Sequence, residues 1–168
     1  MTQSDSSSDA QAQLQSAIER SALLGRPGFL IRRLHQVHGS LFLEETREFA
    51  ITPVQYSLMT ALSERGEMDQ ISLALQLGLE RTSVAEVIPR LEARGLLSRR
   101  QSADDKRVKL VKLTRKGRAL VVKMAPAVQR AHDRTIEAIP PGERAQFMLQ
   151  LIRLVEAGGD YGVPLALP

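Results

Sequence analysis

Residues 74–117 read ALQLGLERTSVAEVIPRLEARGLLSRRQSADDKRVKLVKLTRKG. Ala74, Gly78 and Val84 follow the spacing Ala-x3-Gly-x5-Val, in which a small residue lets two helices approach, glycine takes the turn and a β-branched residue packs the second helix back. Two short runs on either side of the charged tip 103–107 then predict a β-hairpin. Together these features predict a helix-turn-helix that carries a wing.

Helix-start signals precede this segment. Thr52 can act as an N-cap, Pro53 suits the first helical position and Gln55 completes a capping box, so we expect a helix from here to Arg65. A short helix is predicted over residues 70–77. The next helix is predicted over 81–94, and its apolar residues fall on one face. These residues are Val84, Val87, Ile88 and Leu91.

Longer amphipathic helices are predicted at both ends. A first helix over 29–47 repeats apolar residues at helical spacing, and a long helix follows the N-cap Thr114. A last helix begins at Pro140-Pro141. We expect it to turn four apolar side chains inward, namely Phe147, Leu151, Leu154 and Val155.

Composition excludes several classes of protein. The 168 residues include no cysteine, which rules out disulfides, thiolate metal sites and thiol redox sensing. No apolar run is long enough for a membrane span, and residues 1–13 lack the apolar core of a signal peptide, so we expect a cytoplasmic protein. We also find no catalytic triad, paired-carboxylate motif or phosphate loop, and we predict neither an enzyme nor a cofactor.

Charge is distributed unevenly along the chain. Residues 81–118 contain twelve basic and four acidic residues, a net charge of +8 in a chain whose formal charge is only +4. The rest of the protein is therefore acidic overall. A basic block inside an acidic protein indicates a surface that binds a polyanion, although incidental solvated charge is the alternative.

Four motifs resemble the MarR family of transcriptional regulators, over roughly residues 28–158. They are ITPVQ at 51–55, LEARGL at 91–96, DDKR at 104–107 and LTRKG at 113–117. The resemblance implies a triangular dimer with the recognition helix in the major groove and the wing in the minor groove. Two residues depart from the family pattern. Lys106 replaces the first wing arginine and loses its fork geometry, and Pro89 removes the hydrogen bond to Ala85 inside the recognition helix.

The resemblance completes the predicted architecture. The fold class is mainly α with a small β-hairpin wing, a winged helix-turn-helix with N- and C-terminal dimerisation helices. The predicted parts are a flexible N-terminal arm at 1–13, a single domain at 14–158 and a C-terminal tail at 159–168. Within the domain, the winged helix-turn-helix occupies about 50–117 and the dimerisation helices about 14–48 and 118–158.

The candidate DNA-binding residues lie on the recognition helix and the wing. They are Arg81, Thr82, Ser83, Glu86, Arg90, Lys106, Arg107 and Lys109. Arginine can clasp guanine with two hydrogen bonds, and the negative potential of a minor groove favours Arg107, which Asp105 is expected to orient. The alternative is that Arg90 and Arg94 pair with Glu86 and Glu92.

The first long helix suggests a site for an effector. The candidate ligand-binding residues are Arg32, Arg33, His35, His38, Phe49 and Tyr56, cations and histidines beside apolar walls. Two alternative hypotheses to ligand binding remain open for the histidines. Either the histidines are hydrogen-bonded packing residues, or they bind zinc together with His132, Glu44 or Glu45. Regulators of the family that this sequence resembles often govern the degradation of aromatic acids. The resemblance therefore suggests a benzoate, hydroxycinnamate or nicotinate-type acid as the effector.

The predicted function is a homodimeric repressor that leaves a pseudo-palindromic double-stranded operator when a small aromatic acid binds. The rival predictions are a winged-helix module that binds protein, and a regulator that has no aromatic-acid ligand.

Overall fold

The computed structural model describes residues 3–158, and the predicted tail at 159–168 lies outside this range. The described helices are α1 (Gln3–Arg20), α2 (Pro27–Glu45), α3 (Pro53–Arg65), α4 (Gln70–Leu77), α5 (Arg81–Ala93), α6 (Arg115–Thr135) and α7 (Pro141–Glu156). Two 3-10 helices, η1 (Ala22–Gly25) and η2 (Arg47–Phe49), flank α2. The strands are β1 (Met68–Asp69), β2 (Leu97–Gln101) and β3 (Lys109–Leu113). No helix in residues 3–158 combines the length and apolar character needed to cross a membrane.

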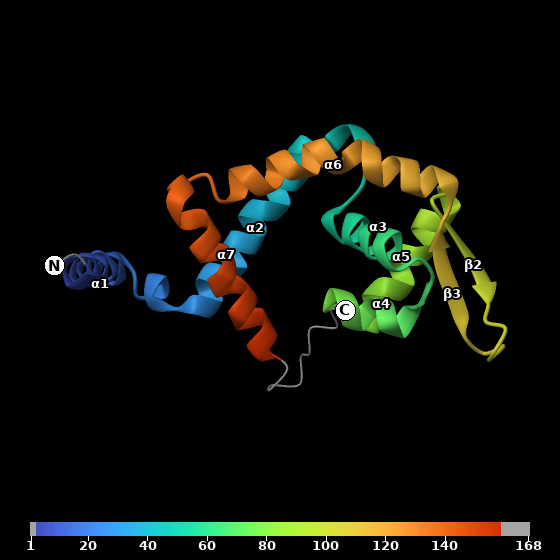
Figure 1. Ribbon diagram of the computed structural model, residues 1–168, viewed down its shortest axis with the longest axis horizontal. Coiled ribbons are helices and arrows are strands. Elements are labelled where there is room, and N and C mark those ends of the chain that lie inside the picture. The colour runs from blue at the N-terminus through green and yellow to red at the C-terminus, as the bar shows by residue number, and fades with distance from the viewer. Residues whose placement is uncertain (1–2, 159–168) are drawn as a thin grey trace.

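The two longest central helices connect the ends of the molecule. Helices α2 and α6 pack side by side, and the winged domain, formed by α3, α4, α5 and the hairpin, lies at one end of α6 (Figure 1). Helices α1 and α7 lie at the other end (Figure 1). This architecture confirms the predicted fold class, a mainly helical winged helix-turn-helix.

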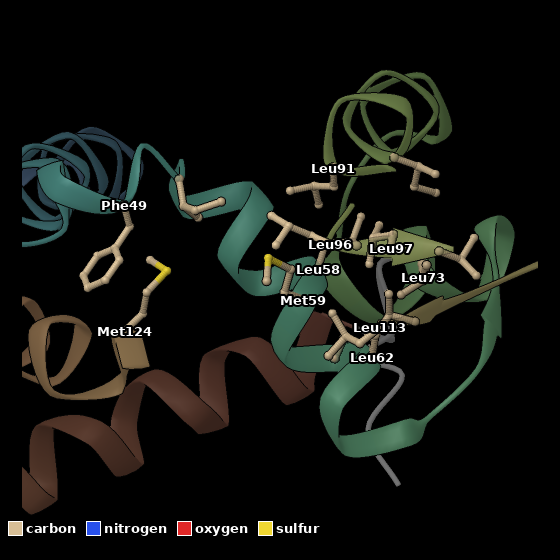
Figure 2. Packing of buried hydrophobic residues seen from close by; sticks show 14 of the residues in the cluster. Phe49, Leu58, Met59, Leu62, Leu73, Leu91, Leu96, Leu97, Leu113 and Met124 are labelled. Carbon is tan, nitrogen blue, oxygen red and sulfur yellow. The ribbon is translucent and has the colours of Figure 1, made fainter. Parts of the chain in front are cut away.

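A single apolar core holds the winged domain together. The three strands form an antiparallel sheet in the order β1-β3-β2, in which Leu97 pairs with Leu113. Leu58 of α3, Leu91 of α5 and Leu73 of α4 are fully buried against this sheet (Figure 2). Each such side chain contributes roughly 1.5–3 kcal/mol by leaving water, so the core fixes where α5 lies.

The helix starts agree with the capping chemistry of the sequence. The Thr52 side chain accepts from the Gln55 backbone N–H at 3.3 Å, and the Gln55 side chain accepts from the Thr52 N–H at 3.1 Å, which completes the predicted capping box. Asp69 caps α4 in a similar way, accepting from the backbone of Ile71 and Ser72. Helix α5 continues past Pro89 without interruption.

Two parts of the chain differ from the sequence prediction. Residues 3–20 form one helix where we predicted a flexible arm to residue 13. Ala and Gln residues, which favour helix, and a 3.0 Å hydrogen bond from the Gln13 side chain to Asp9 one turn earlier stabilise this helix. Leu154 and Val155 of α7 do not point inward, because their exposed fractions are 65% and 50%. Within one chain, no residue of α7 is buried.

Candidate nucleic-acid interface

Helix α5 has a buried face and an exposed face. Val84, Ile88 and Leu91 are fully buried in the core, as the apolar spacing predicts. The opposite face, which we call the α5 outer face, consists of Arg81, Thr82, Ser83, Glu86 and Arg90. All of these residues are exposed except Ser83, which is half-buried. The packing of α5 therefore presents two arginines to solvent.

The cations of the α5 outer face are not neutralised by neighbours. In the part of the chain that the structure describes, no ion pair includes Arg81, Glu86 or Arg90. The alternative in which Arg90 pairs with Glu86 does not occur. Glu92 pairs instead with Arg99 of β2. Arg81 and Arg90 therefore keep their N–H donors available for another partner.

Arg94, which closes α5, also makes a contact that we did not predict. Its guanidinium donates to two backbone carbonyls, those of Ala50 at 2.6 Å and Phe49 at 2.9 Å. The predicted alternative, a pair with Glu92, is therefore wrong. Arg94 belongs to the basic segment of the sequence, but its donors are used inside the protein.

Arg107 projects from the tip of the wing. Its side chain is 91% exposed, and its guanidinium forms a paired contact with Asp105, with Nη2–Oδ2 and Nε–Oδ1 distances of 3.0 and 3.1 Å. Asp105 also accepts from the Arg107 backbone N–H at 2.9 Å. The hydrogen bonds from Arg107 lower the pKa of the Asp105 carboxyl, which stays ionised. The structure thus contains the contact that we expected between Asp105 and Arg107.

An ion pair near the tip end of β2 ties the wing to the segment before β1, and a groove lies between the wing and α4. Arg100 of β2 binds Glu67 through two hydrogen bonds, with an Nε–Oε1 distance of 2.8 Å. Lys106 and Lys109 are exposed beside Arg107. A groove of about 500 Å³ separates the wing from the start of α4; it is lined by residues 69–72 and 107–109. The sequence did not indicate Arg100 or Glu67, because their contact joins residues far apart in the chain.

A second cluster lies between α2, α3 and α6, and we call it the histidine cluster: His38, Phe42, Tyr56, His132 and Thr135. The rings of His38 and His132 stack with their centroids 5.0 Å apart. Phe42 packs edge-on against His38 at 6.4 Å and contacts Tyr56 at 5.8 Å. The cluster therefore joins α3 of the winged domain to the α2–α6 pair.

Hydrogen bonding defines the state of His38. Its Nδ1 lies 2.9 Å from Thr135 Oγ1, and the Thr135 hydroxyl donates to the Ala131 carbonyl at 2.6 Å. The Thr135 oxygen must then accept from His38, which places the proton on Nδ1 and leaves Nε2 as an acceptor. Burial lowers the pKa of His38, and the nearby His132 and His35 lower it further. The neutral ring is therefore favoured at neutral pH.

The predicted ligand residues do not form one site. His38 and Tyr56 both contact Phe42 in the histidine cluster, and Phe49 lies elsewhere, buried against Met124 (Figure 2). Arg32, Arg33 and His35 are all exposed on α2. Helical spacing in the sequence predicts the side of α2 on which these residues lie, but it does not predict which part of α2 is covered by other helices. A groove of about 310 Å³ adjoins the cluster and is lined by residues that include Tyr56, Thr60 and His132.

The carboxylates of the zinc hypothesis are engaged in ion pairs. Glu45 binds Arg130 at 2.8 Å, and Arg134 contacts Glu44 at 2.9 Å and Glu45 at 2.8 Å. Within residues 3–158, no three His, Asp or Glu side chains come together as a metal site. The structure therefore favours packing or ligand binding for His38.

Comparison with known proteins identifies the family. The model of the MarR family matches residues 51–109. The HTH-type transcriptional repressor NicR of Pseudomonas putida is 24% identical over 135 residues, which cover 80% of this chain and 85% of NicR. The solved structure of Bordetella bronchiseptica BpsR is 30% identical, with a TM-score of 0.72, over 77% of this chain and 92% of BpsR. Streptomyces coelicolor PcaV is also 30% identical, with a TM-score of 0.67, over 80% of this chain and 98% of PcaV. The chain therefore belongs to the MarR family and is a DNA-binding transcriptional regulator rather than an enzyme.

Proposed function

We propose that this chain is a homodimeric repressor that binds a pseudo-palindromic operator through the α5 outer face and the wing, and leaves it when a small aromatic acid binds. The observation that carries the DNA-binding part is the placement of Arg107. Its guanidinium is held by Asp105 and is still 91% exposed. A cation fixed in direction at the tip of a hairpin suits a minor groove, where the potential is most negative.

The proposed dimer follows from apolar surface that a single chain leaves open. Among the described residues, fourteen large apolar side chains are exposed, and eleven of these lie on α1, η1, α2 and α7. Scattered exposed apolar residues are normal, but a concentration of this kind marks an interaction surface. Twofold pairing through these helices would bring two copies of α5 to successive major grooves.

Substitution of Arg107 by alanine tests the wing contact. We expect Arg107→Ala to weaken binding to all duplexes and to lower the slope of log K against log salt by about one unit per subunit, because one phosphate neighbour loses its cation. Fluorescence anisotropy over a salt series measures this slope. Arg20→Ala, at the far end of the molecule on α1, is the matched control and should leave the slope unchanged. An unchanged slope for Arg107→Ala would remove Arg107 from the interface.

Arg81 is expected to behave differently. If Arg81 reads a base edge, Arg81→Ala should cost roughly 1–3 kcal/mol on the operator and relax the preference at one position of each half-site. Equal losses on operator and random DNA would reduce Arg81 to a phosphate contact.

The effector proposal rests on the histidine cluster. BpsR is described as having its DNA binding regulated by 6-hydroxynicotinic acid. In this chain, His38 Nε2 is an acceptor on a ring that packs against Phe42, which in turn contacts Tyr56, and this combination suits a ring bearing a hydroxyl or N–H group. Arg32 and Arg33 lie on the same helix but outside the histidine cluster, so their part in holding a carboxylate is tested separately by Arg32→Ala and Arg33→Ala.

Release requires that the acid bind the free dimer more tightly than the DNA-bound dimer. A hundredfold preference would shift the equilibrium by about 2.7 kcal/mol. We expect calorimetry with 6-hydroxynicotinate, benzoates and hydroxycinnamates to detect binding that weakens in His38→Ala and in Arg32→Ala or Arg33→Ala. Equal binding by all these variants, or binding that leaves operator affinity unchanged, would contradict the effector site.

A further inference from the structure

The segment between α2 and α3 carries local backbone strain. Ala50 adopts the left-handed conformation, with φ 49° and ψ 46°, and it is the only non-glycine residue in the described chain with a positive φ. A Cβ atom disfavours this conformation, so its neighbours must hold the segment in place. Phe49 and Ile51 on either side of Ala50 are buried in the core.

Arg94 holds the same segment from the other side. Its Nη1 donates to the Ala50 carbonyl at 2.6 Å, and its Nη2 donates to the Phe49 carbonyl at 2.9 Å. One planar group therefore spans two successive peptides at the point where the backbone turns. The arginine belongs to the end of α5, so the clamp ties the α2–α3 connection directly to the recognition helix.

The second connection to the winged domain meets the same end of α5. The Arg94 carbonyl accepts from Lys116 Nζ at 2.9 Å, and the Gly95 carbonyl accepts from the Thr114 hydroxyl at 2.8 Å. Thr114 and Lys116 begin α6, which packs along α2. Both chain segments that join the winged domain to the α2–α6 pair are thus hydrogen-bonded to residues 94–95.

We infer that Arg94 is a positioning residue for DNA binding: through the carbonyls of Phe49 and Ala50 it fixes the angle at which α5 presents its outer face. The inference rests on the proposed role of α5 as the recognition helix. Without the clamp, the winged domain that carries α5 is freer to change its angle to the α2–α6 pair, and fixing that angle on binding weakens specific binding. The competing role for a cation in this basic segment is a direct phosphate contact.

Arginine is required because of its shape. A guanidinium presents parallel N–H groups that reach two carbonyl oxygens at once, whereas the lysine ammonium is a point charge on a flexible stem. Arg94→Lys therefore keeps the charge and loses the clamp, and Arg94→Gln loses both. A phosphate contact would be largely preserved in Arg94→Lys, so the two roles predict different results.

The experiment measures operator and random-duplex affinity over a salt series for the wild type, Arg94→Gln and Arg94→Lys, with Arg107→Ala as the phosphate-contact reference. Concentrations are corrected for the active fraction by stoichiometric titration. We expect both Arg94 variants to lose about tenfold in operator affinity, equivalent to about 1.4 kcal/mol. The salt slope and the affinity for random DNA should stay close to those of the wild type. Hydrogen exchange of the free protein should rise at residues 49–51 and 92–96.

Three results would overturn the inference. They are a salt slope reduced as in Arg107→Ala, rescue by Arg94→Lys, and an affinity loss that disappears after correction for the active fraction. If Arg94→Gln does not fold, Arg94→Lys decides between the two roles. Failure of the wild type itself to bind any duplex would instead reject the proposed function, so the two failures are distinguishable.

Discussion

Gly117→Ala is expected to destabilise the protein by about 3 kcal/mol, because it forces a methyl group into occupied space. A Cβ at this position would lie 2.2 Å from the Leu96 carbonyl oxygen and 2.9 Å from Leu113 Cδ2. The Leu96 oxygen cannot easily move away, since it accepts hydrogen bonds from both the backbone N–H and the hydroxyl of Thr114. The clash therefore falls on the junction of α6 with the hairpin.

Thermal or denaturant unfolding measures this effect. Gly142→Ala in α7 is the matched control, since a Cβ there meets nothing within 4 Å. This control should be neutral or slightly stabilising, because alanine favours helix more than glycine does. A Gly117→Ala variant as stable as the wild type would mean that α6 does not pack this closely on Leu96. The close approach also explains why a glycine ends the LTRKG motif.

Ile152→Glu is expected to break the dimer and to reduce operator affinity by at least about a hundredfold, because two linked half-site contacts become independent. Met148, Ile152 and Val155 lie on one face of α7 at helical spacing, and their exposed fractions in the single chain are 45%, 44% and 50%. A carboxylate in this apolar face would have to leave water when the face packs against a second copy of the chain, and that desolvation disfavours the dimer.

Light scattering and anisotropy follow the two effects together. Gln150→Glu places the same charge on another side of α7 and should leave both the dimer and the affinity unchanged. A dimeric Ile152→Glu protein with normal operator binding would exclude α7 from the interface. Loss of affinity without loss of the dimer would point to a different role for this helix.

Local chemistry made much of the fold predictable from the sequence. The capping box at Thr52 and Gln55 marks the start of α3, and the apolar spacing of Val84, Ile88 and Leu91 gives the buried face of α5. These signals depend on residues within a few positions of one another, so no knowledge of the tertiary structure is needed. The outer face of α5 follows from the same spacing.

Contacts between distant segments could not be predicted. The partners of Arg94 are backbone carbonyls more than forty residues earlier, and such acceptors leave no trace in side-chain identity. The stack of His38 on His132 depends on how α2 meets α6. The inward direction predicted for Leu154 and Val155 assumed that an apolar face is covered by its own chain.

Selection of DNA ligands tests the central claim most directly. The full chain is incubated with a randomised duplex library, and the enriched sequences are bound again over a range of salt. We expect a pseudo-palindrome with half-sites about one helical turn apart, and affinity that falls steeply between about 50 and 200 mM salt. The absence of any enriched sequence, together with binding that does not respond to salt, would contradict the account.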